Sequence, residues 1–323
     1  MILGIESTAH TFGVGIVEES SVLANEREAF TSEGGGMIPY EVAEHHRKNW
    51  KTVLTNALHA ANASIEDIDG IAYSQGPGIG NCLRIGAVVA RSLNLRYKIP
   101  LIPVNHCVAH LEIGRLLGKL DDVVLLYASG ANTQIIIYEG GRYRVLGETL
   151  DMGTGNFLDS LGRKMGLGFP AGPKIEELAK ETEEIVHLPY TVKGMNISLG
   201  GIYTHISERL QSVDNTVIAN SLQETVFAML VEVSERALAL TQASGLVLGG
   251  GVACNGRLQS MSKIMAEERG CEWYAPPNEF LVDNGAMIAV AGELLHRHNA
   301  TVPVEKADVK PKQRTDYVEI PYR

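Results

Sequence analysis

The chain carries one strand-and-turn pattern twice, and this repeat constrains the fold more than any other feature. The spacing Ser-x-Ala-x-Thr interrupts two apolar runs at residue 7 and again at residue 129. A second unit, an apolar run that enters a glycine-rich turn and then a helical pattern, occurs at 70–97 and at 245–268. Alternating polarity predicts strands, and the glycine-rich turns predict strand-to-helix connections. The sequence therefore predicts a duplicated α/β chain.

The second copy is longer than the first, because its two units lie further apart. The extra residues fall at 151–205, a glycine-rich segment. Outside it, the order of elements resembles the duplicated actin-like ATPase fold of actin, sugar kinases and heat-shock chaperones, in which two lobes flank a central cleft. We expect an N-terminal lobe at 1–118, completed by 299–323, and a C-terminal lobe at 119–298 that contains the insertion. The mildly basic end, 310–323, alternates in polarity and predicts a terminal strand or a partner contact.

Composition limits which cellular compartments and which classes of protein are compatible with this chain. The 323 residues carry a net charge of −10, which argues against a chain that coats nucleic acid by itself. The four cysteines are scattered and form no Cys-x-x-Cys pair, so they predict free thiols rather than a disulfide framework. No uncharged run is apolar enough for a membrane span, and the N-terminus lacks the basic segment of a signal peptide. These features favour a cytoplasmic protein with no membrane contact.

Four predicted turns at the cleft are suited to an anionic ligand. Glycine-rich turns at 76–80 and 248–255 each precede a helix, and the turns at 7–11 and 129–133 add hydroxyl and amide donors. Backbone N–H groups at helix starts bind anions well. None of the four matches the P-loop pattern, and each alone is also typical of a tight packing turn. Together they favour a nucleotide-like ligand.

Two histidines and an aspartate form the most specific pattern of metal-binding side chains. His106 and His110 lie four residues apart on a predicted helix that Asn105 can cap, so both face one side of it. This spacing suits two ligands of one metal, and it suits paired surface histidines equally well. Asp283 begins the equivalent helix of the second half, where it is either an ordinary N-cap or a group that faces the cleft. Cys107 occupies the glutamate position of H-E-x-x-H, which argues against a metallopeptidase.

The insertion adds charged residues beside the predicted cleft. Asp159 lies four residues before Arg163 on a predicted helix, which is a routine surface pair. Gly172 directly precedes a helix that bears Glu176. Surface exposure is the ordinary role of such charges, but an insertion is also where a shared scaffold is adapted to its own substrate.

A set of ordered motifs resembles one enzyme family over most of the chain. The motifs are GIESTAHTFGVGIV, SQGPGIG, VNHCVAH, YASGANTQ, GETLDMGTGNFLD, GLGFPAGPKIEELA, LGGGVACN, DNGAMIA and RTDYVEI. They are similar to the archaeal and eukaryotic branch of the tRNA threonylcarbamoyltransferases, the catalytic subunit of the KEOPS complex. This branch is related to bacterial TsaD and was formerly labelled O-sialoglycoprotein endopeptidase. Three positions depart from the pattern: Ser7 and Ala131 each replace a glycine, and Gly200 replaces a serine.

The resemblance implies an activity and a set of partners. It implies transfer of the threonylcarbamoyl group from threonylcarbamoyl-AMP to the exocyclic N6 amine of the adenosine beside the anticodon, in tRNAs that read codons beginning with A. It implies two KEOPS subunits as partners besides tRNA: a small atypical protein kinase or ATPase and a small dimerising subunit. We expect the predicted helix at 39–62 to dock the dimerising subunit.

Two alternative activities use the same fold. An ATP-binding phosphotransferase would need an aspartate for magnesium at the end of the first strand, and Glu6 takes that position. A chaperone-like ATPase would have no use for a metal site built from histidines.

The resemblance also implies which residues form the site. It implies one iron-type metal, with zinc or magnesium as alternatives, held by His106, His110, Tyr127 and Asp283. It places the nucleotide, ATP or threonylcarbamoyl-AMP, against Tyr127, Ala128, Ser129, Gly130, Ala131, Asp159, Gly172, Glu176 and Asn255. Two imidazoles, a phenolate and a carboxylate form a hard set of donors without thiolate. We name no general base.

Overall fold

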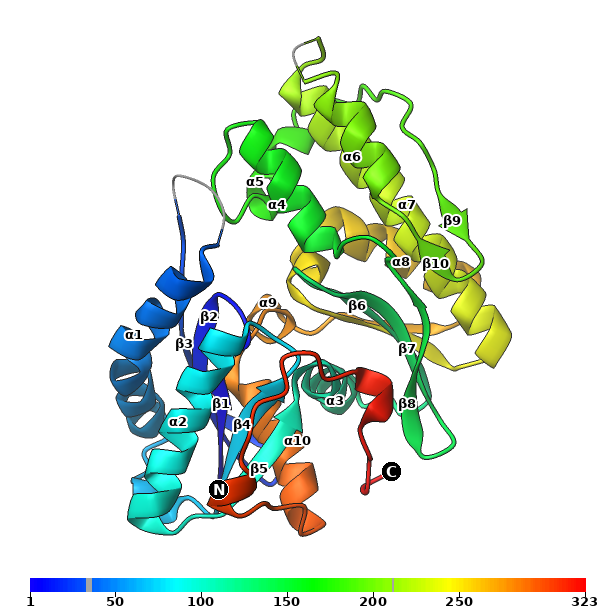
Figure 1. Ribbon diagram of the computed structural model, residues 1–323. Helices are drawn as coiled ribbons and strands as arrows, with labels where there is room; N and C mark the ends of the chain where they lie inside the picture. Colours follow the sequence, from blue (N-terminus) through cyan, green and yellow to red (C-terminus); the bar gives the residue numbers. More distant parts are fainter. Residues whose placement is uncertain (33–36, 211) are drawn as a thin grey trace.

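The computed structural model describes residues 1–32, 37–210 and 212–323, and it contains two five-stranded sheets (Figure 1). The first sheet has the order β3-β2-β1-β4-β5. Its strands are β1 (Ile2–Glu6), β2 (Thr11–Glu18), β3 (Ser21–Ala29), β4 (Gly70–Gly76) and β5 (Leu101–Asn105). The first three pair antiparallel, and β4 and β5 continue the sheet in parallel with β1. Parallel strands at one edge require helical crossovers, which bring helices onto the faces of this sheet.

The second sheet repeats the first in order and direction. Its order is β12-β11-β6-β7-β8, again three antiparallel strands followed by two parallel ones. The strands are β6 (Val123–Ala128), β7 (Thr133–Glu139), β8 (Arg142–Glu148), β11 (Gly245–Gly249) and β12 (Glu272–Tyr274). The two Ser-x-Ala-x-Thr turns occupy equivalent places, between β1 and β2 and between β6 and β7. The predicted duplication and its α/β class are therefore confirmed.

Helices connect the strands and fill the insertion. They are α1 (Pro39–Ala60), α2 (Gly80–Tyr97), α3 (His106–Gly118), α4 (Thr154–Lys164), α5 (Gly172–Ala179), α6 (Gly200–Ser207), α7 (Asn215–Thr241), α8 (Gly256–Glu268), α9 (Asn278–Leu281) and α10 (Gly285–Arg297). Short 3-10 turns are η1 (Ile65–Asp67), η2 (Gly251–Cys254), η3 (Val304–Lys306) and η4 (Thr315–Tyr317). Among the described residues, no helix is both long enough and apolar enough to cross a membrane.

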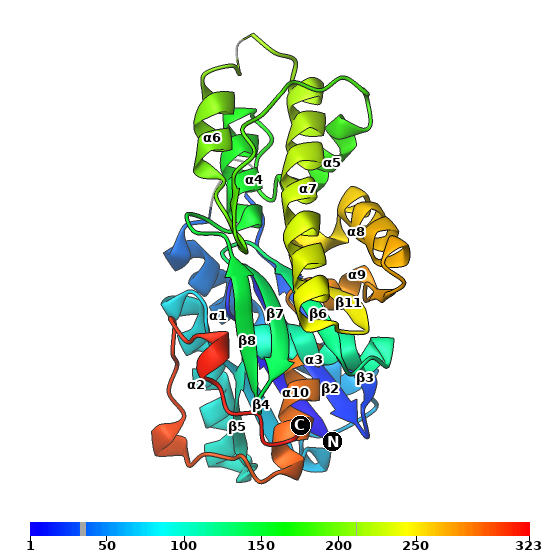
Figure 2. The same cartoon turned by 90° about the vertical axis from the view of Figure 1, so that its right-hand side faces the viewer.

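The predicted insertion forms its own small layer at the end of the second lobe. It contributes α4, α5 and α6, which stand beside the upper part of α7 (Figure 2), and a two-stranded ribbon that contacts α7 and β8. The ribbon pairs β9 (Val192–Lys193) with β10 (Asn196–Ile197). The apolar faces of these elements join one large core with α7 and the second sheet. The insertion therefore extends the second lobe and is not a separate domain.

The last helix of each half lies between the two sheets. Helix α10 contacts β1, β2 and β4 of the first sheet, although it follows the strands of the second. Helix α3 contacts β6 and β11 of the second sheet and also packs against α10. A core of buried apolar side chains joins α3, α10 and the first sheet. The lobe boundaries at residues 118 and 298 stay a prediction, since α3 and α10 each serve both halves.

The end of the chain crosses between the lobes. Val302 pairs with Leu101 at the edge of the first sheet, and the backbone N–H of Lys310 donates to Gln75. The Tyr138 hydroxyl, on the second sheet, donates to the backbone oxygen of Arg323. Alternating polarity predicted a terminal strand or a partner contact here, but the structure forms the 3-10 turn η4 and no strand. Isolated backbone hydrogen bonds and side-chain contacts hold the chain end, and alternation detects neither.

Glycines let α10 lie directly on the backbone of β1 and β2. A Cβ added at Gly15 would overlap the backbone of Ala286, and one added at Gly285 would overlap the backbone of Val14 and Gly15. A Cβ at Gly4 would likewise overlap the backbone around Ala289. The helix therefore sits closer to the sheet than side chains would allow.

We expect the change Gly15→Ala to lower the free energy of unfolding by about 1–3 kcal/mol, because the added methyl must push α10 off the sheet. Urea denaturation followed by circular dichroism measures this loss. Gly201→Ala is the control, since a Cβ there meets only Pro189 at 3.8 Å, and it should leave stability unchanged or slightly higher. Equal stability of the two variants would contradict the close packing of α10.

Candidate metal and nucleotide site

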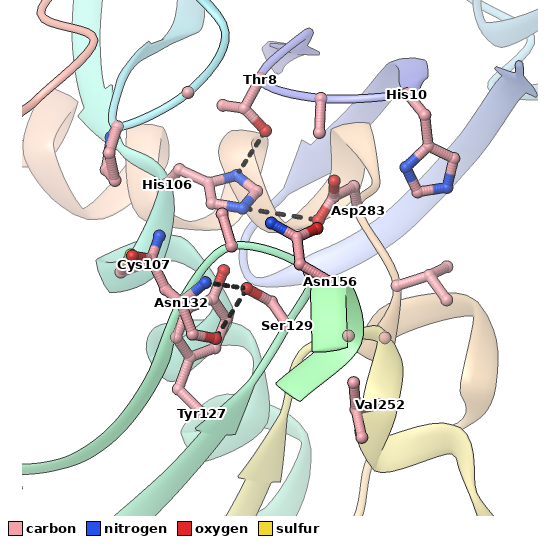
Figure 3. Close-up of a pocket in the computed structure, with 18 of the residues that line it drawn as sticks. Thr8, His10, His106, Cys107, Tyr127, Ser129, Asn132, Asn156, Val252 and Asp283 are labelled. Atoms are coloured by element: carbon pink, nitrogen blue, oxygen red, sulfur yellow. Dashed lines mark hydrogen bonds and ion pairs between the residues drawn. The ribbon is translucent and has the colours of Figure 1, made fainter. Parts of the chain in front are cut away.

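A cavity of about 710 Å³ opens between the lobes, and both copies of the repeat line it. Thr8 and His10 reach it from the β1–β2 turn, and Ser129 reaches it from the equivalent β6–β7 turn (Figure 3). The glycine-rich turns contribute Gly78 and Gly251. All four turns predicted to face one ligand therefore meet at this cavity.

His106, His110 and Asp283 form a buried cluster at one side of the cavity. One ligand atom of each lies within 4.8 Å of the others. Asp283 Oδ1 is 3.4 Å from His106 Nε2 and 3.3 Å from His110 Nε2. Asn105 caps α3 as predicted, and its side chain accepts a hydrogen bond from Val108 N at 3.1 Å. The i, i+4 spacing thus places both imidazoles on one face, opposite the carboxylate.

Asp283 is not the N-cap of α10. That role belongs to Asn284, whose side chain accepts a hydrogen bond from Met287 N at 2.9 Å. The ordinary interpretation of Asp283 as a cap is therefore wrong. With the helix start satisfied by its neighbour, the Asp283 carboxylate faces the two histidines from the opposite lobe.

Glu6 orients His106, a role that the sequence did not reveal. Glu6 Oε2 lies 3.0 Å from His106 Nδ1, and Thr8 Oγ1 lies 3.3 Å from the same nitrogen. A carboxylate at Nδ1 makes this nitrogen the donor and leaves Nε2 directed at Asp283. The available signal was a single acidic residue at the end of an otherwise apolar strand.

The charges of the cluster favour a cation. Burial opposes protonation of His106, but the carboxylates of Glu6 and Asp283 outweigh it and raise the pKa of His106 to about 9. Burial lowers the pKa of His110. Burial also opposes ionisation of Asp283, yet the two imidazoles hold the pKa of Asp283 well below its usual range. Two carboxylates therefore lie against His106, and a metal cation would fit the same place with nitrogen and oxygen donors.

Tyr127 lies beside the cluster at the end of β6. Its ring centroid is 5.1 Å from that of His110 and 6.4 Å from that of His106. The side chain is buried, and burial raises the pKa of its phenol well above the usual value. Ionisation of this phenol would therefore need a cation close by.

The β6–β7 turn is held rigidly against the start of α4. Backbone N–H groups of Gly155 and Asn156 donate to the oxygens of Ser129 and Gly130, at 2.9 and 2.8 Å. Ser129, Gly130 and Ala131 line the cavity as the resemblance implied. Ala128 is buried in β6 and is not among the lining residues.

The remaining predicted ligand residues line the other side of the cavity, and most of them also support the fold. Asp159, Gly172, Glu176 and Asn255 all lie there. Asp159 accepts a hydrogen bond from Ala171 N at 2.7 Å, and burial raises the pKa of Asp159. Glu176 accepts from Gly256 N at 2.9 Å, which fastens α5 to the start of α8.

Asn255 has two structural contacts besides its place at the cavity. Its carbonyl oxygen caps α8 by accepting from Arg257 N at 2.9 Å. Its amide donates to Gln223 Oε1 at 2.5 Å. A change at Asn255 would therefore disturb helix α8 as well as any ligand, because the cap satisfies otherwise unpaired N–H groups.

Two of the three departures from the motif pattern lie away from the cavity lining. The Ser7 hydroxyl is buried without a hydrogen-bond partner and faces Gly86 of α2, where a Cβ would overlap it. Gly200 N donates to Asp151 at 2.6 Å at the start of α6. Ala131 is the departure that does line the cavity.

Solved structures with less than 20% identity share the fold. HypF of Thermococcus kodakarensis aligns with a TM-score of 0.66 at 14% identity, over 93% of this chain and 48% of that one. An activator of 2-hydroxyisocaproyl-CoA dehydratase from Clostridium difficile, with bound ADPNP, aligns with a TM-score of 0.58 at 14% identity, over 92% and 96%. These likenesses define a two-lobed protein of the actin-like ATPase fold, and the cavity between its lobes contains a possible His-His-Asp cation site.

Sequence comparison specifies the family. The family model TsaD, described as tRNA N6-adenosine threonylcarbamoyltransferase, matches residues 20–290. The enzyme of that name from Thermococcus kodakarensis is 51% identical over 98% of both chains. Its namesake from Archaeoglobus fulgidus is 47% identical, also over 98% of both. The chain belongs to the TsaD family of tRNA N6-adenosine threonylcarbamoyltransferases.

Gly172 gives a direct test of where a nucleotide binds. Among the residues that the structure describes, no heavy atom lies within 4 Å of a Cβ built at Gly172, so a side chain there would enter the cavity. We expect Gly172→Leu to keep the thermal stability but to weaken ATP binding at least tenfold in isothermal titration calorimetry. Gly201→Leu, the same change away from the cavity, is the control. Unchanged ATP affinity in Gly172→Leu would place the nucleotide elsewhere.

Proposed function

We propose that this chain transfers the threonylcarbamoyl group of threonylcarbamoyl-AMP to the N6 amine of the adenosine beside the anticodon, in tRNAs that read codons beginning with A. The match to the family model over residues 20–290 carries this proposal. The cavity between the lobes supports it, since it combines a cation site with the two turns and the glycine loops. A simple phosphotransferase is disfavoured, because Glu6 contacts His106 and Thr8 instead of facing an open magnesium site.

The proposed metal is iron, held by His106, His110, Tyr127 and Asp283. The buried positions of His106, His110 and Tyr127, the half-buried Asp283 and the two carboxylates close to His106 support this set. A phenolate donor favours iron(III) over zinc or magnesium among hard N/O sites. When bound, the metal would hold the donor's oxygens and polarise the reacting carbonyl. Glu6 would accept a hydrogen bond from Nδ1–H of His106, which leaves Nε2 free to bind the metal.

We place threonylcarbamoyl-AMP, the proposed donor of the acyl group, along the cavity between the β6–β7 turn and α5. Ser129, Gly130 and Ala131 offer backbone and hydroxyl groups at a turn that contacts with α4 hold in place. Such groups stabilise the negative charge that develops on the carbonyl oxygen and on the departing phosphate. Glu176 is suited to accept hydrogen bonds from ribose hydroxyls, and Gly172 leaves room for the nucleoside.

The proposed reaction is a direct acyl transfer. The N6 amine attacks the carbonyl carbon of the mixed anhydride, a C–N bond forms, the C–O bond to the phosphate breaks, and AMP leaves with the bonding electrons. The amine gives up one proton in the process. The donor is already activated, so the residues of the chain need only orient it, exclude water and stabilise charge. No covalent intermediate on the chain is required.

The proposed partners are tRNA and two KEOPS subunits, a small atypical kinase or ATPase and a dimerising protein, in the cytoplasm. The charge of −10 supports a need for partners, because affinity for RNA depends mainly on cations that neutralise phosphates. Helix α1 is our candidate for the dimerising subunit. Ile38 and Tyr40 at its start are 55% and 68% exposed, which leaves apolar surface for a partner. Trp50 packs partly against the core of the first lobe.

The proposed phenolate ligand predicts a spectroscopic signature. Protein purified with iron(III) should show a visible charge-transfer band, and Tyr127→Phe should abolish that band while three ligands still retain iron. Absorption spectra with parallel metal analysis measure both effects. Tyr138→Phe, on the same sheet but bonded to Arg323, should keep the band. A band that survives in Tyr127→Phe would exclude this residue as a ligand.

The activity itself is tested by mass spectrometry of adenosines from tRNA. We expect threonylcarbamoyladenosine when tRNA is incubated with threonine, bicarbonate, ATP, the adenylate-forming enzyme, this chain and the proposed partner subunits. Omission of the partners should lower turnover at least tenfold and flatten the salt dependence of tRNA binding, because this chain supplies few free cations. No modified adenosine in the complete mixture would refute the proposed activity. Full turnover by the chain alone would refute the need for partners.

A further inference from the structure

The end of the chain forms the rim of the cavity where the two lobes face each other. We call the residues from Lys310 to Tyr317 the C-terminal strap; Figure 1 shows it in red, crossing from the first lobe to the side of β8. Gln313 Nε2 donates to Gln75 Oε1 of the first lobe at 3.1 Å. Thr315 Oγ1 donates to Gln134 Oε1 of the second lobe at 3.4 Å. The strap is therefore fixed at both sides of the cavity.

Three residues of the strap expose two cationic groups and one aromatic ring to solvent. Lys312 and Arg314 are exposed and line the cavity. Tyr317, on the same 3-10 turn as the buried Thr315, is 76% exposed, the highest value among the large apolar side chains in the described part of the chain. A single exposed tyrosine is common on protein surfaces and needs no explanation alone. The unusual feature is its position beside Arg314, a cation that does line the cavity, while Tyr317 itself lies just outside the lining.

Arg314 and Tyr317 form a pre-arranged pair. The Arg314 guanidinium lies 5.9 Å from the centre of the Tyr317 ring. Asp316 accepts two hydrogen bonds from Arg314, at 3.0 and 3.1 Å, and so fixes the plane of the guanidinium. The Asp316 carboxylate also offsets the charge of Arg314. The pair therefore offers flat surfaces rather than a strong positive charge.

Flat aromatic and guanidinium surfaces recognise unstacked nucleobases. Bases in RNA loops are splayed out and stack on tyrosine rings or arginine planes, and this contact tolerates any base. Lys312 adds a second cation next to the pair and forms no ion pair with any residue that the structure describes, which suits a phosphate of the same strand. An apolar protein segment would gain nothing from Lys312. The chemistry of the rim thus fits a nucleotide in a single-stranded loop.

We propose that Arg314 and Tyr317 form a stacking platform for the base next to the target adenosine, while the target itself enters the cavity. This inference rests on the proposed function, because it assigns a place to the RNA on which that function acts. Both residues act as positioning residues. They hold the loop so that one base can stay in the cavity, and they touch none of the reacting atoms.

The platform is tested with a stem-loop RNA that carries 2-aminopurine, a fluorescent base quenched by stacking, next to the target adenosine. We expect the protein, assembled with the proposed partner subunits, to quench the fluorescence on binding, the same assembly with Tyr317→Ala to quench far less, and that with Tyr317→Phe to restore quenching. Arg314→Lys, which keeps the charge but loses the plane, should also quench less. Tyr190→Ala is the matched control, since Tyr190 is an exposed tyrosine bonded to Glu232, whereas Tyr317 contacts the cavity-lining Arg314.

Kinetics distinguish a stacking role from a general loss of structure. In the complete tRNA modification mixture, Tyr317→Ala should raise the KM for tRNA roughly tenfold, the effect of losing one stacked base, and leave kcat nearly unchanged. ATP affinity should be the same as in the unaltered chain. Quenching by Tyr317→Ala equal to that of the unaltered chain, or no quenching by either, would overturn the platform. Absence of modified adenosine with intact quenching would instead refute the proposed function alone.

Discussion

Direct contact between the backbone of α10 and the backbones of β1 and β2 is the constraint on which the site depends. Glycines at positions 4, 15 and 285 remove the side chains that would normally separate a helix from a sheet. Asp283 lies two residues before α10 begins, and α3, which carries both histidines, packs against the same helix. Main-chain contacts therefore set the distance between the Asp283 carboxylate and the imidazoles of His106 and His110, and close packing leaves these side chains few alternative rotamers. Because the helix and the sheet cannot shift relative to each other, the three metal-binding side chains keep well-defined positions.

Sequence patterns predicted the architecture well because the repeat is local and periodic. The strand alternation and the glycine-rich turns recur in the same order in both halves, and the two sheets reproduce that order. The exchange of α3 and α10 between the sheets could not be predicted, since an amphipathic helix shows that one face is buried but not against which sheet. The C-terminal strap was also missed as a rim of the cavity. It is held by isolated backbone hydrogen bonds at Lys310 and Pro311 and by side-chain hydrogen bonds from Gln313 and Thr315, and these leave no periodic signal.

At the site, the sequence predicted which side chains could bind a metal, but not which neighbouring residues hold them in position. His106, His110 and Asp283 do meet, because duplication relates the helices that carry them. Glu6 could not be assigned, since its role depends on a contact with a histidine 100 residues away. Asn284 and Asp283 are adjacent polar residues at a helix start, and only geometry shows which of them caps the helix and which faces the histidines. Glu176 and Asn255 proved to hold α5 and α8 as well as to line the cavity.

The reciprocal exchange of α3 and α10 also bears on how such a chain could have arisen. A single unfused copy would have left uncovered the side of its last helix that here contacts the other sheet, and a symmetric pair that packed each last helix against the other copy's sheet would have buried it. Every residue in such a pair is present twice, so both copies must carry the same side chains. Fusion into one chain removes that requirement. One half was then free to keep two histidines on its last helix, and the other to keep an aspartate at the matching place.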